Sequence, residues 1–351
     1  MPEPILSEPH AKHRLKTLDA FRGIAILAVL LYHYTYRWGP LWPDHRDFYG
    51  FQTNVSWFAL GSYGVEFFFI ISGFVIFLTL EHCNGWRDFA LRRFARLYPT
   101  YWVCMLVTFF AIHWFGNPDF YRRPVELLVG FTMLSQQFGV GWVDGSYWSL
   151  LMELVFYFWI ALIFFAFRSR FLAAWVGFCV LASLVNYFDS HYGRMFFAAR
   201  YLCYFTAGMA FYSVHARRPL RFVVTLFVTA LVLYLAFFYG HSTNEHLLVA
   251  GMVALFALFA SGRLHWLGRG PLAYVGLVSY PLYLLHNHIG VSLIGHFNRI
   301  GWLNGWAAIA AASAIVFAMA VCVHYAVELP SQKIVRRLFE RWGSLRLAKA
   351  A

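Results

Sequence analysis

Uncharged apolar stretches of nearly membrane-spanning length recur along the whole of this chain. The first follows Arg22: no Asp, Glu, Lys or Arg appears again before Arg37, and Leu, Ile, Val and Ala fill most of the interval. A helix needs about 20 mainly apolar residues to cross the roughly 30 Å hydrocarbon core of a bilayer. Of the 351 residues, 61% are hydrophobic and only 13% are charged. The chain is therefore predicted to be an all-α, polytopic integral membrane helical bundle.

The distribution of positive charge predicts how often the chain crosses the membrane. Ten spans are expected, at about 18–36, 63–80, 97–115, 148–167, 171–188, 201–214, 222–239, 247–261, within 271–298, and 305–327. A further uncharged segment, 127–143, is broken by three glycines. If that segment does not fully cross, most of the 28 Lys and Arg residues lie on the side of the N-terminus. Because Lys and Arg accumulate in cytoplasmic loops, we expect ten transmembrane helices, one re-entrant or interfacial segment, and both termini in the cytoplasm.

Two short basic tails flank the predicted membrane domain. The tails are residues 1–16 and 331–351, and the domain between them is 17–330. The net charge of +12 does not by itself indicate nucleic acid, because cytoplasmic basic residues are the usual pattern in membrane proteins. The five cysteines show no CxxC pair and no metal-ligand spacing, so neither a metal nor a bound cofactor is predicted.

Four polar residues stand out at the start of the first span and within it. Thr17 is predicted to cap the helix, with Asp19 near the positive end of its dipole. Arg22 and His33 are eleven residues apart, which is about 1100° of helical rotation, so they share one face about 16 Å apart. Ionisable groups at that depth are costly and are usually functional. The alternative is a packing histidine with an arginine that reaches the membrane surface.

Other ionisable side chains fall in the outer half of the predicted bundle. Glu153 is the single charge of its span and is expected at a depth similar to that of His33, where it can orient a catalytic imidazole. Alternatively, Glu153 is a buried acid paired with Arg200. Glu66 is also outer, and its alternative is an ordinary interfacial charge. His286 follows Pro281 in a predicted kinked span, where packing is the alternative to a functional role.

The inner surface of the predicted bundle carries an arginine pair. Arg93 and Arg96 are three residues apart, so both can lie on one helical face and bind phosphate oxygens. The alternative is ordinary cytoplasmic charge, or binding of lipid headgroups. Glu328 ends the last span at the same surface, and we expect it to form a salt bridge with a nearby arginine.

These residues lie in motifs that resemble the acyltransferase-3 family of integral membrane O-acyltransferases. One hallmark is an Arg followed by ten residues and a His, here Arg22 and His33 in LDAFRGIAILAVLLYH. A second is the Arg-x-x-Arg pair, here Arg93 and Arg96 in FALRRFARLYPTYW. Three further segments are similar to family spans: GVEFFFIISGFVIF, SYWSLLMELVFYFW and SYPLYLLHNHI. The resemblance runs from about Lys16 to Pro330.

The resemblance implies an enzyme of the bacterial cytoplasmic (inner) membrane that moves an acyl group, commonly acetyl, from cytoplasmic acyl-CoA to a hydroxyl of a carbohydrate or glycosylated acceptor. When the functional residues of the family are carried over to this sequence, His33 corresponds to the catalytic histidine and Glu153 to a site acid. Arg93 and Arg96 correspond to the donor-binding pair. Arg22 is structural or donor-facing. Whether His33 acts as a general base or forms an acyl-histidine stays open.

Two other classes of function compete with this reading. A proton-coupled transporter or flippase for a glycan or glycolipid also uses buried ionisable groups and broken spans. A lipid-binding or scaffolding membrane protein would not need His33 at all. The absence of H-E-x-x-H, G-x-S-x-G and P-loop motifs weighs against metalloprotease, hydrolase and nucleotide-driven mechanisms.

Overall fold

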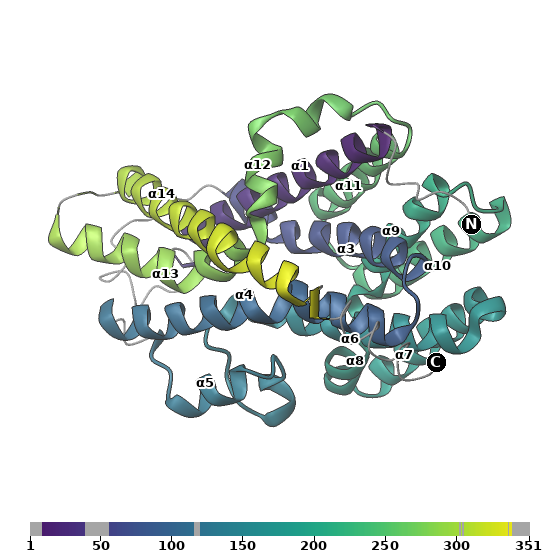
Figure 1. Cartoon of the computed structure of the whole chain (residues 1–351), viewed down its shortest axis with the longest axis horizontal. Coiled ribbons are helices and arrows are strands. Elements are labelled where there is room, and N and C mark those ends of the chain that lie inside the picture. Colours follow the sequence, from purple (N-terminus) through teal and green to yellow (C-terminus); the bar gives the residue numbers. More distant parts are fainter. Residues whose placement is uncertain are drawn as a thin grey trace. The chain divides into compact units, whose positions relative to one another are not determined.

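A computed structural model describes residues 9–38, 56–115, 120–301, 303, 305–335 and 337–338 of the chain. These described residues form helices and no strand, as the apolar pattern predicts (Figure 1). Seven stretches among them are long and apolar enough to cross a membrane. They are Lys16–Arg37, Trp57–Glu81, Trp86–Phe115, Gly145–Phe188, Leu220–Phe238, Thr243–Ala260 and Gly305–Val335.

The predicted count of ten spans is not fixed by these stretches. Gly145–Phe188 contains two of the predicted spans, as the consecutive helices α6 (Trp148–Phe167) and α7 (Phe171–Phe188). The predicted sixth and ninth spans correspond to α9 (Leu202–His215) and α13 (Ser279–Ile300), which are helical but lie outside the seven stretches. The polytopic helical class is thus confirmed, whereas the count of ten stays a prediction.

The chain divides into two compact units. The main helices of the first unit, besides α6, α7 and α9, are α1 (Pro9–Tyr32), α3 (Gly64–Glu81), α8 (Ser190–Phe197), α10 (Leu220–Phe238), α11 (Thr243–Ala260) and α12 (Pro271–Leu277). Its short turns are η2 (His33–Arg37), η4 (Ser56–Tyr63), η8 (Arg168–Arg170), η9 (Ala199–Tyr201) and η10 (His265–Arg269). The second unit holds α4 (Trp86–Phe115), α5 (Pro124–Gly130), η6 (Ser135–Phe138), η7 (Gly145–Tyr147), α13, α14 (Gly305–Val323) and η11 (His324–Glu328).

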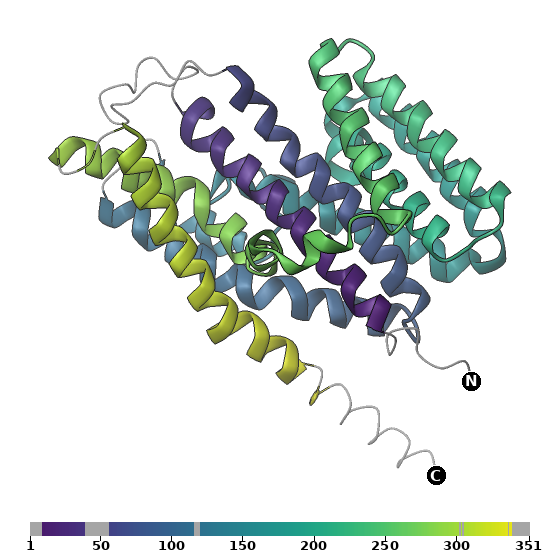
Figure 2. The same ribbon diagram turned by 90° about the horizontal axis from the view of Figure 1, so that it is seen from above.

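Two close helix contacts organise the first unit, and glycines make both possible. In the α3–α9 contact, a Cβ at Gly73 would lie 2.0 Å from the carbonyl oxygen of Phe205, and one at Gly208 would lie 2.0 Å from that of Ile70. In the α1–α12 contact the glycines are Gly23 and Gly276, where an added Cβ would lie 2.1 Å and 1.6 Å from a backbone carbonyl oxygen. Small residues drive helix association in membranes because they let backbones approach closely. Figures 1 and 2 show α1 and α3 running side by side.

The first helix begins earlier than the sequence predicts. Helix α1 starts at Pro9, so Thr17 lies inside it and does not cap it. The Thr17 side chain is buried, and its hydroxyl lies 3.5 Å from the carbonyl oxygen of Leu264. The prediction was wrong because the polar residues before Thr17 also suit a helix, and a cap is only one use of a hydroxyl.

The second unit is built on the long helix α4, and the segment containing α5 lies along one side of that helix (Figure 1). Predicted segment 127–143 contains only the end of this seven-residue helix and the short turn η6. Neither approaches the roughly 20 residues that a crossing needs. Hydrogen bonds fasten the segment to α4: Tyr101 donates to the carbonyl oxygen of Gly130 at 3.0 Å, and Trp102 to that of Phe131 at 2.9 Å. The described segment therefore has the irregular form expected from the charge argument.

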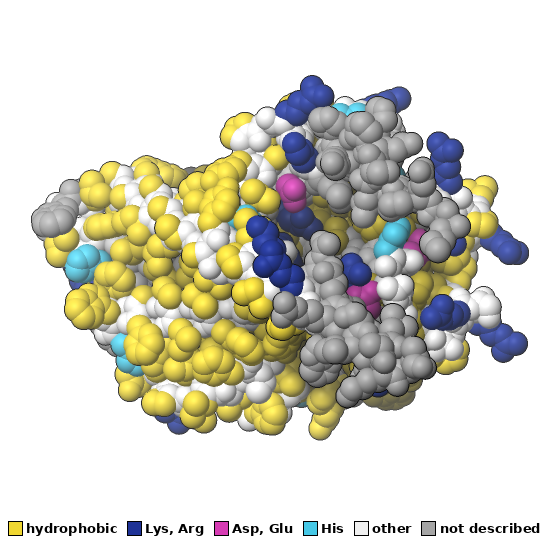
Figure 3. Space-filling view, viewed as in Figure 1, with side chains coloured by type: hydrophobic (Ala, Val, Ile, Leu, Met, Phe, Trp, Pro, Cys, Tyr) yellow, Lys and Arg dark blue, Asp and Glu magenta, His cyan; other side chains and the backbone are white. Residues whose placement is uncertain are grey.

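Hydrophobic side chains cover much of the face shown in Figure 3, and the Lys and Arg side chains visible on it gather toward the right of the view. Exposed large hydrophobic residues occur on many helices; they include Leu128, Phe158, Val180, Leu184, Val228, Leu231 and Ile315. A soluble protein rarely exposes so much continuous apolar surface, whereas a lipid-facing surface must be apolar.

Candidate active site

His33 lies where the chain changes from the α-helix α1 to a π-helical turn. The α-helix ends at Tyr32, and His33 is the first residue of the π-helical turn η2, a rare element that often marks functional sites. The half-buried imidazole has its Nδ1 atom 3.0 Å from the carbonyl oxygen of Val29. Because a carbonyl only accepts, Nδ1 must carry a proton, and in the neutral ring the lone pair is then on Nε2. This tautomer suits a base that takes a proton at Nε2.

Arg22 lies on the same helix as His33, and its guanidinium is engaged within the helix. Its Nη1 atom lies 2.7 Å from the Oδ1 atom of Asp19, one turn earlier, and both side chains are about a quarter exposed. Asp19 therefore neutralises Arg22 instead of serving the helix terminus. The arrangement favours the structural reading of Arg22 over a donor-facing one.

Glu153 is held by two hydroxyl groups within the first unit. Ser72 of α3 donates to its Oε1 atom at 2.6 Å, and Tyr157, one turn along α6, donates to the same oxygen. Arg200 is not among its partners, so the expected alternative of a Glu153–Arg200 pair is not realised among the described residues. No hydrogen bond or ion pair joins Glu153 to His33 among the described residues. Its role in orienting His33 stays a prediction.

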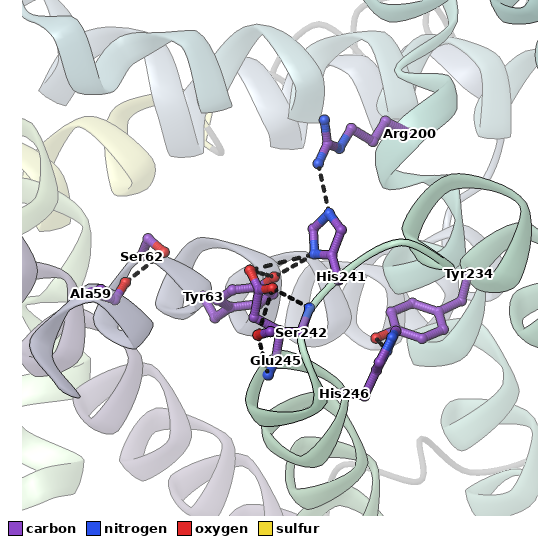
Figure 4. A network of polar contacts seen from close by, with 9 residues as sticks. All are labelled: Ala59, Ser62, Tyr63, Arg200, Tyr234, His241, Ser242, Glu245 and His246. Carbon is purple, nitrogen blue, oxygen red and sulfur yellow. Dashed lines mark hydrogen bonds and ion pairs between the residues drawn. The ribbon is translucent and has the colours of Figure 1, made fainter. Parts of the chain in front are cut away.

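Arg200 belongs to a different polar network, which Figure 4 shows. Its Nη2 atom donates to Nε2 of His241 at 3.3 Å, and Nδ1 of His241 lies 2.9 Å from the hydroxyl of Tyr63. Tyr63 in turn donates to Oε1 of Glu245 at 2.7 Å. The network joins η9, the α10–α11 connection, α11 and the end of η4 just before α3, so it fastens several parts of the first unit together.

Glu66 lies one turn after Tyr63, in the first turn of α3. Its Oε2 atom is buried and has no hydrogen-bond partner among the described residues. Buried polar atoms in proteins are nearly always hydrogen-bonded, so this carboxylate oxygen is an exception among the described residues. Glu66 therefore remains a candidate, and it is more buried than the interfacial charge that was its alternative.

The two arginines of the predicted donor pair have different surroundings in the second unit. Arg96 forms an ion pair with Glu328, which confirms the salt bridge expected for that acid, and its Cζ atom lies 5.7 Å from the ring centroid of Tyr280. Arg93 lies over the ring of Phe89, with 5.9 Å between Cζ and the ring centroid. Neighbouring Arg92 binds Asp88 through two hydrogen bonds, of 2.6 and 3.1 Å. Arg93 and Arg96 are both half-buried on one face of α4, whereas Arg92 is exposed.

His286 and its neighbours are buried in the second unit. The His286 side chain has no exposed surface, and its Nδ1 atom lies 2.6 Å from the carbonyl oxygen of Tyr283. His288 stacks on Phe120 with 4.1 Å between ring centroids. These contacts are those of packing histidines. In the described ranges, no group of three or more His, Cys, Asp or Glu side chains is arranged to hold a metal ion.

Asp144 is a buried site that the sequence argument overlooked. Its carboxylate accepts hydrogen bonds of 2.8 Å from the Ser146 backbone and hydroxyl, from the Asn287 amide and from the His288 backbone. Burial alone would raise the pKa of Asp144, but His288, His286 and the N–H donors lower it to about 2, so it is ionised at neutral pH. The sequence signal was the Asp-Gly-Ser turn placed just before an apolar span, since Asp two residues before Ser forms such turns.

Comparisons with known proteins place this arrangement in a family. A model of the acyltransferase domain family matches residues 15–325. The chain is 25% identical to an O-acetyl transferase of Shigella phage Sf6, over 41% of this chain and 44% of that protein. It is 26% identical to the peptidoglycan O-acetyltransferase OatA of Listeria monocytogenes, over 42% and 24%, and 28% identical to the acyltransferase MdmB of Streptomyces mycarofaciens, over 41% and 38%.

These matches cover less than half of the length of each relative. No solved structure matches the chain. The family model, in contrast, covers most of the chain and includes every residue of the Arg22–His33 and Arg93–Arg96 motifs. The chain therefore belongs to the acyltransferase-3 family, as its motifs indicate.

Proposed function

We propose that the chain is a membrane-bound O-acyltransferase that moves an acyl group, most simply acetyl, from cytoplasmic acyl-CoA to a hydroxyl of a carbohydrate or glycosylated acceptor. The observation that carries the proposal is His33, a half-buried imidazole at a π-helical turn whose Nδ1 is fixed on the Val29 carbonyl. The names of the relatives, two of which are O-acetyltransferases, favour acetyl as the acyl group.

His33 is the general base in this proposal. Its Nε2 atom takes the proton of the acceptor hydroxyl as the hydroxyl oxygen attacks the carbonyl carbon of the thioester. The new ester C–O bond forms and the C–S bond breaks, so CoA leaves as a thiolate. The proton held on Nε2 then passes to that sulfur, which yields acylated acceptor and CoA thiol. No redox step and no metal is needed for this balance.

The donor enters from the arginine side of the enzyme. Arg93 and Arg96 bind phosphate oxygens of CoA, because a guanidinium is the side chain best suited to phosphate. Arg22 supports the helix that carries His33 through its pair with Asp19. The extended pantetheine arm can then carry the thioester away from the phosphates toward the interior of the membrane domain, residues 17–330.

The same proposal sets the orientation of the enzyme in the bacterial inner membrane. Both basic tails face the cytoplasm, and the acceptor is modified at the outer side. Reporter fusions after Arg96, Arg218 and Arg269 should read cytoplasmic, whereas a fusion near Asp189 should read external. An external reading at Arg218 would overturn the ten-span topology.

A purified-protein assay tests the proposal directly. The chain in detergent or nanodiscs should release thiol from acetyl-CoA, and His33→Ala should lower kcat by roughly 100- to 10,000-fold with little change in CoA binding. A transporter or flippase would bind or move its substrate without releasing thiol. If His33→Ala retains kcat while CoA binding is lost, the assigned roles are wrong.

A further inference from the structure

The carboxylate of Glu328 is fully buried and fixed on both of its oxygens. Its Oε1 atom pairs with Nη1 of Arg96, and its Oε2 atom lies 2.7 Å from Nδ1 of His324, one turn earlier in the chain. The Glu328 side chain has no exposed surface, and that of His324 is 2% exposed. All three residues belong to the second unit. The Glu328 carboxylate is therefore held in one position, with Arg96 as one of its two partners.

The element that carries Glu328 is unusual. His324 and Glu328 begin and end η11, a π-helical turn at the end of α14. Such turns are rare and occur frequently at functional sites. Two π-helical turns are found in the described ranges; one begins at His33 and the other ends at Glu328. The second turn thus places an acid against α4 at the level of the donor pair.

The ion pair leaves Arg96 oriented but not enclosed. A guanidinium has five N–H donors, and Glu328 engages Nη1 alone. The Arg96 side chain is still 33% exposed. Tyr280 limits its motion on another side, since the ring faces the guanidinium and the Tyr280 hydroxyl is itself fixed on the Leu97 carbonyl at 2.8 Å.

Breaking this pair would leave an ionised acid without its cation in a buried site, which is costly. Arg96 is therefore expected to stay on Glu328 whether or not a donor is present. The contrast is Arg92, whose side chain is 52% exposed and whose pair with Asp88 lies within a single helix. Such exposed pairs fix a side chain only weakly.

We propose that Glu328, held by His324, is a positioning residue that fixes Arg96 so that its remaining N–H groups meet a phosphate of acyl-CoA. The inference rests on the proposed function, because it assigns Arg96 to the donor. It goes further in naming an acid from the other end of the chain as part of the donor site. An arginine that is already oriented loses less conformational entropy when the donor binds, so binding is tighter.

Two donors that differ in their phosphates test this role. S-acetylpantetheine has the thioester and the pantetheine arm of acetyl-CoA but lacks all of its phosphates. In Glu328→Gln, the KM for acetyl-CoA should rise about tenfold, with kcat nearly unchanged, while the KM for S-acetylpantetheine stays the same. In an Arg96→Ala background, Glu328→Gln should add nothing further, because the acid acts only through that arginine.

A matched ion pair provides the control. Glu81 pairs with Arg218 in the first unit, and its side chain is 15% exposed. Glu81→Gln should leave the KM of both donors unchanged. If Glu328→Gln does not reach the membrane, Glu328→Asp replaces it, since it keeps the buried charge but withdraws the carboxylate by one methylene; it too should raise only the acetyl-CoA KM.

Three outcomes would overturn the role of Glu328 while leaving the enzyme's function intact. The first is an equal rise in KM for both donors. The second is a further, additive rise in the acetyl-CoA KM when Glu328→Gln is made in the Arg96→Ala background. The third is an unchanged acetyl-CoA KM in the folded Glu328 variants. If the wild-type chain neither binds CoA nor releases thiol from either donor, the proposed function fails, and the positioning role fails with it.

Discussion

The contact between α3 and α9 makes a sharp prediction, because two glycines face each other's helix backbone across it. In Gly73→Ala the added Cβ would lie 2.0 Å from the carbonyl oxygen of Phe205, and in Gly208→Ala it would lie 2.0 Å from that of Ile70. Ordinary contact begins at 3.4 Å, so the helices must separate by about 1.4 Å, which is the difference between the two distances. Neither obstacle is a side chain that can rotate away.

Overpacking of this kind costs about 1–3 kcal/mol, and a clash with backbone belongs at the upper end. The Tm shift is roughly 2–4 °C per kcal/mol for 150–250 residues and is smaller for a longer chain such as this one of 351 residues, so each variant should lower the Tm by about 3–5 °C. The measurement is thermal unfolding of the purified protein in detergent, read by loss of the monodisperse peak.

Two glycines elsewhere in the first unit serve as controls. Gly177 in α7 and Gly251 in α11 have nothing within 4 Å of an added Cβ. Alanine is the better helix former by roughly 1 kcal/mol, so Gly177→Ala and Gly251→Ala should leave the Tm unchanged or raise it slightly. If Gly73→Ala and Gly208→Ala behave like these controls, the close approach of α3 and α9 is not as described.

The clash at Gly73 also reaches the candidate site. Ser72 precedes Gly73 and donates to Glu153 at 2.6 Å. A displacement of α3 by about 1 Å would stretch that bond beyond hydrogen-bonding distance. Gly73→Ala should therefore lower transfer even at temperatures where the protein stays folded, and Gly208→Ala should do so less directly. If Gly73→Ala is as active as the wild type, the Ser72–Glu153 hydrogen bond is not needed for transfer.

Three further outcomes are expected from single substitutions. Glu153→Gln should stay folded in the membrane and lose most of its transfer activity; near-normal turnover would assign the acid to packing alone. Arg93→Ala should raise the KM for acetyl-CoA about 10- to 100-fold, whereas Arg92→Ala, the matched control on the same helix, should not. Because the pKa of Asp144 is lowered to about 2, its carboxylate stabilises the fold fully above about pH 4 and loses that effect as the pH falls toward 2. Asp144→Asn should therefore lower the Tm at pH 7 and have little effect near pH 2; a uniform loss at both would contradict the ionised form.

The sequence predicted the helical class because that class depends on patterns along the chain, and the same patterns supplied the candidate site residues, whose roles stay predictions. Apolar runs between charges located most of the long helices, although α9 and α13 are not apolar or long enough to be assigned as spans from composition alone. The salt bridge of Glu328 was expected because an acid and several arginines were predicted at one surface. Which arginine it takes, Arg96 and not Arg93, depends on the winding of η11, which no periodicity reveals.

The features that sequence reasoning missed are those set by contacts between distant segments. Thr17 looked like a cap, but its hydroxyl lies against a residue 247 positions away. Asp144 was overlooked because half of its donors come from α13, more than 140 positions later. Burial and partner identity at such positions are properties of the packed bundle.

The position of the glycines explains how this unit keeps polar groups away from lipid. Arg22 is followed by Gly23, and Ser72 by Gly73, so each polar residue stands beside a point where its helix touches another backbone. At Gly276 an added Cβ would lie 1.6 Å from the carbonyl oxygen of Asp19, the partner of Arg22. Helices in lipid gain little from burying apolar surface, so close backbone contact through small residues must hold them together. The same contacts exclude lipid from the adjoining faces, which is where an ion pair and a hydroxyl–carboxylate bond can persist inside a membrane.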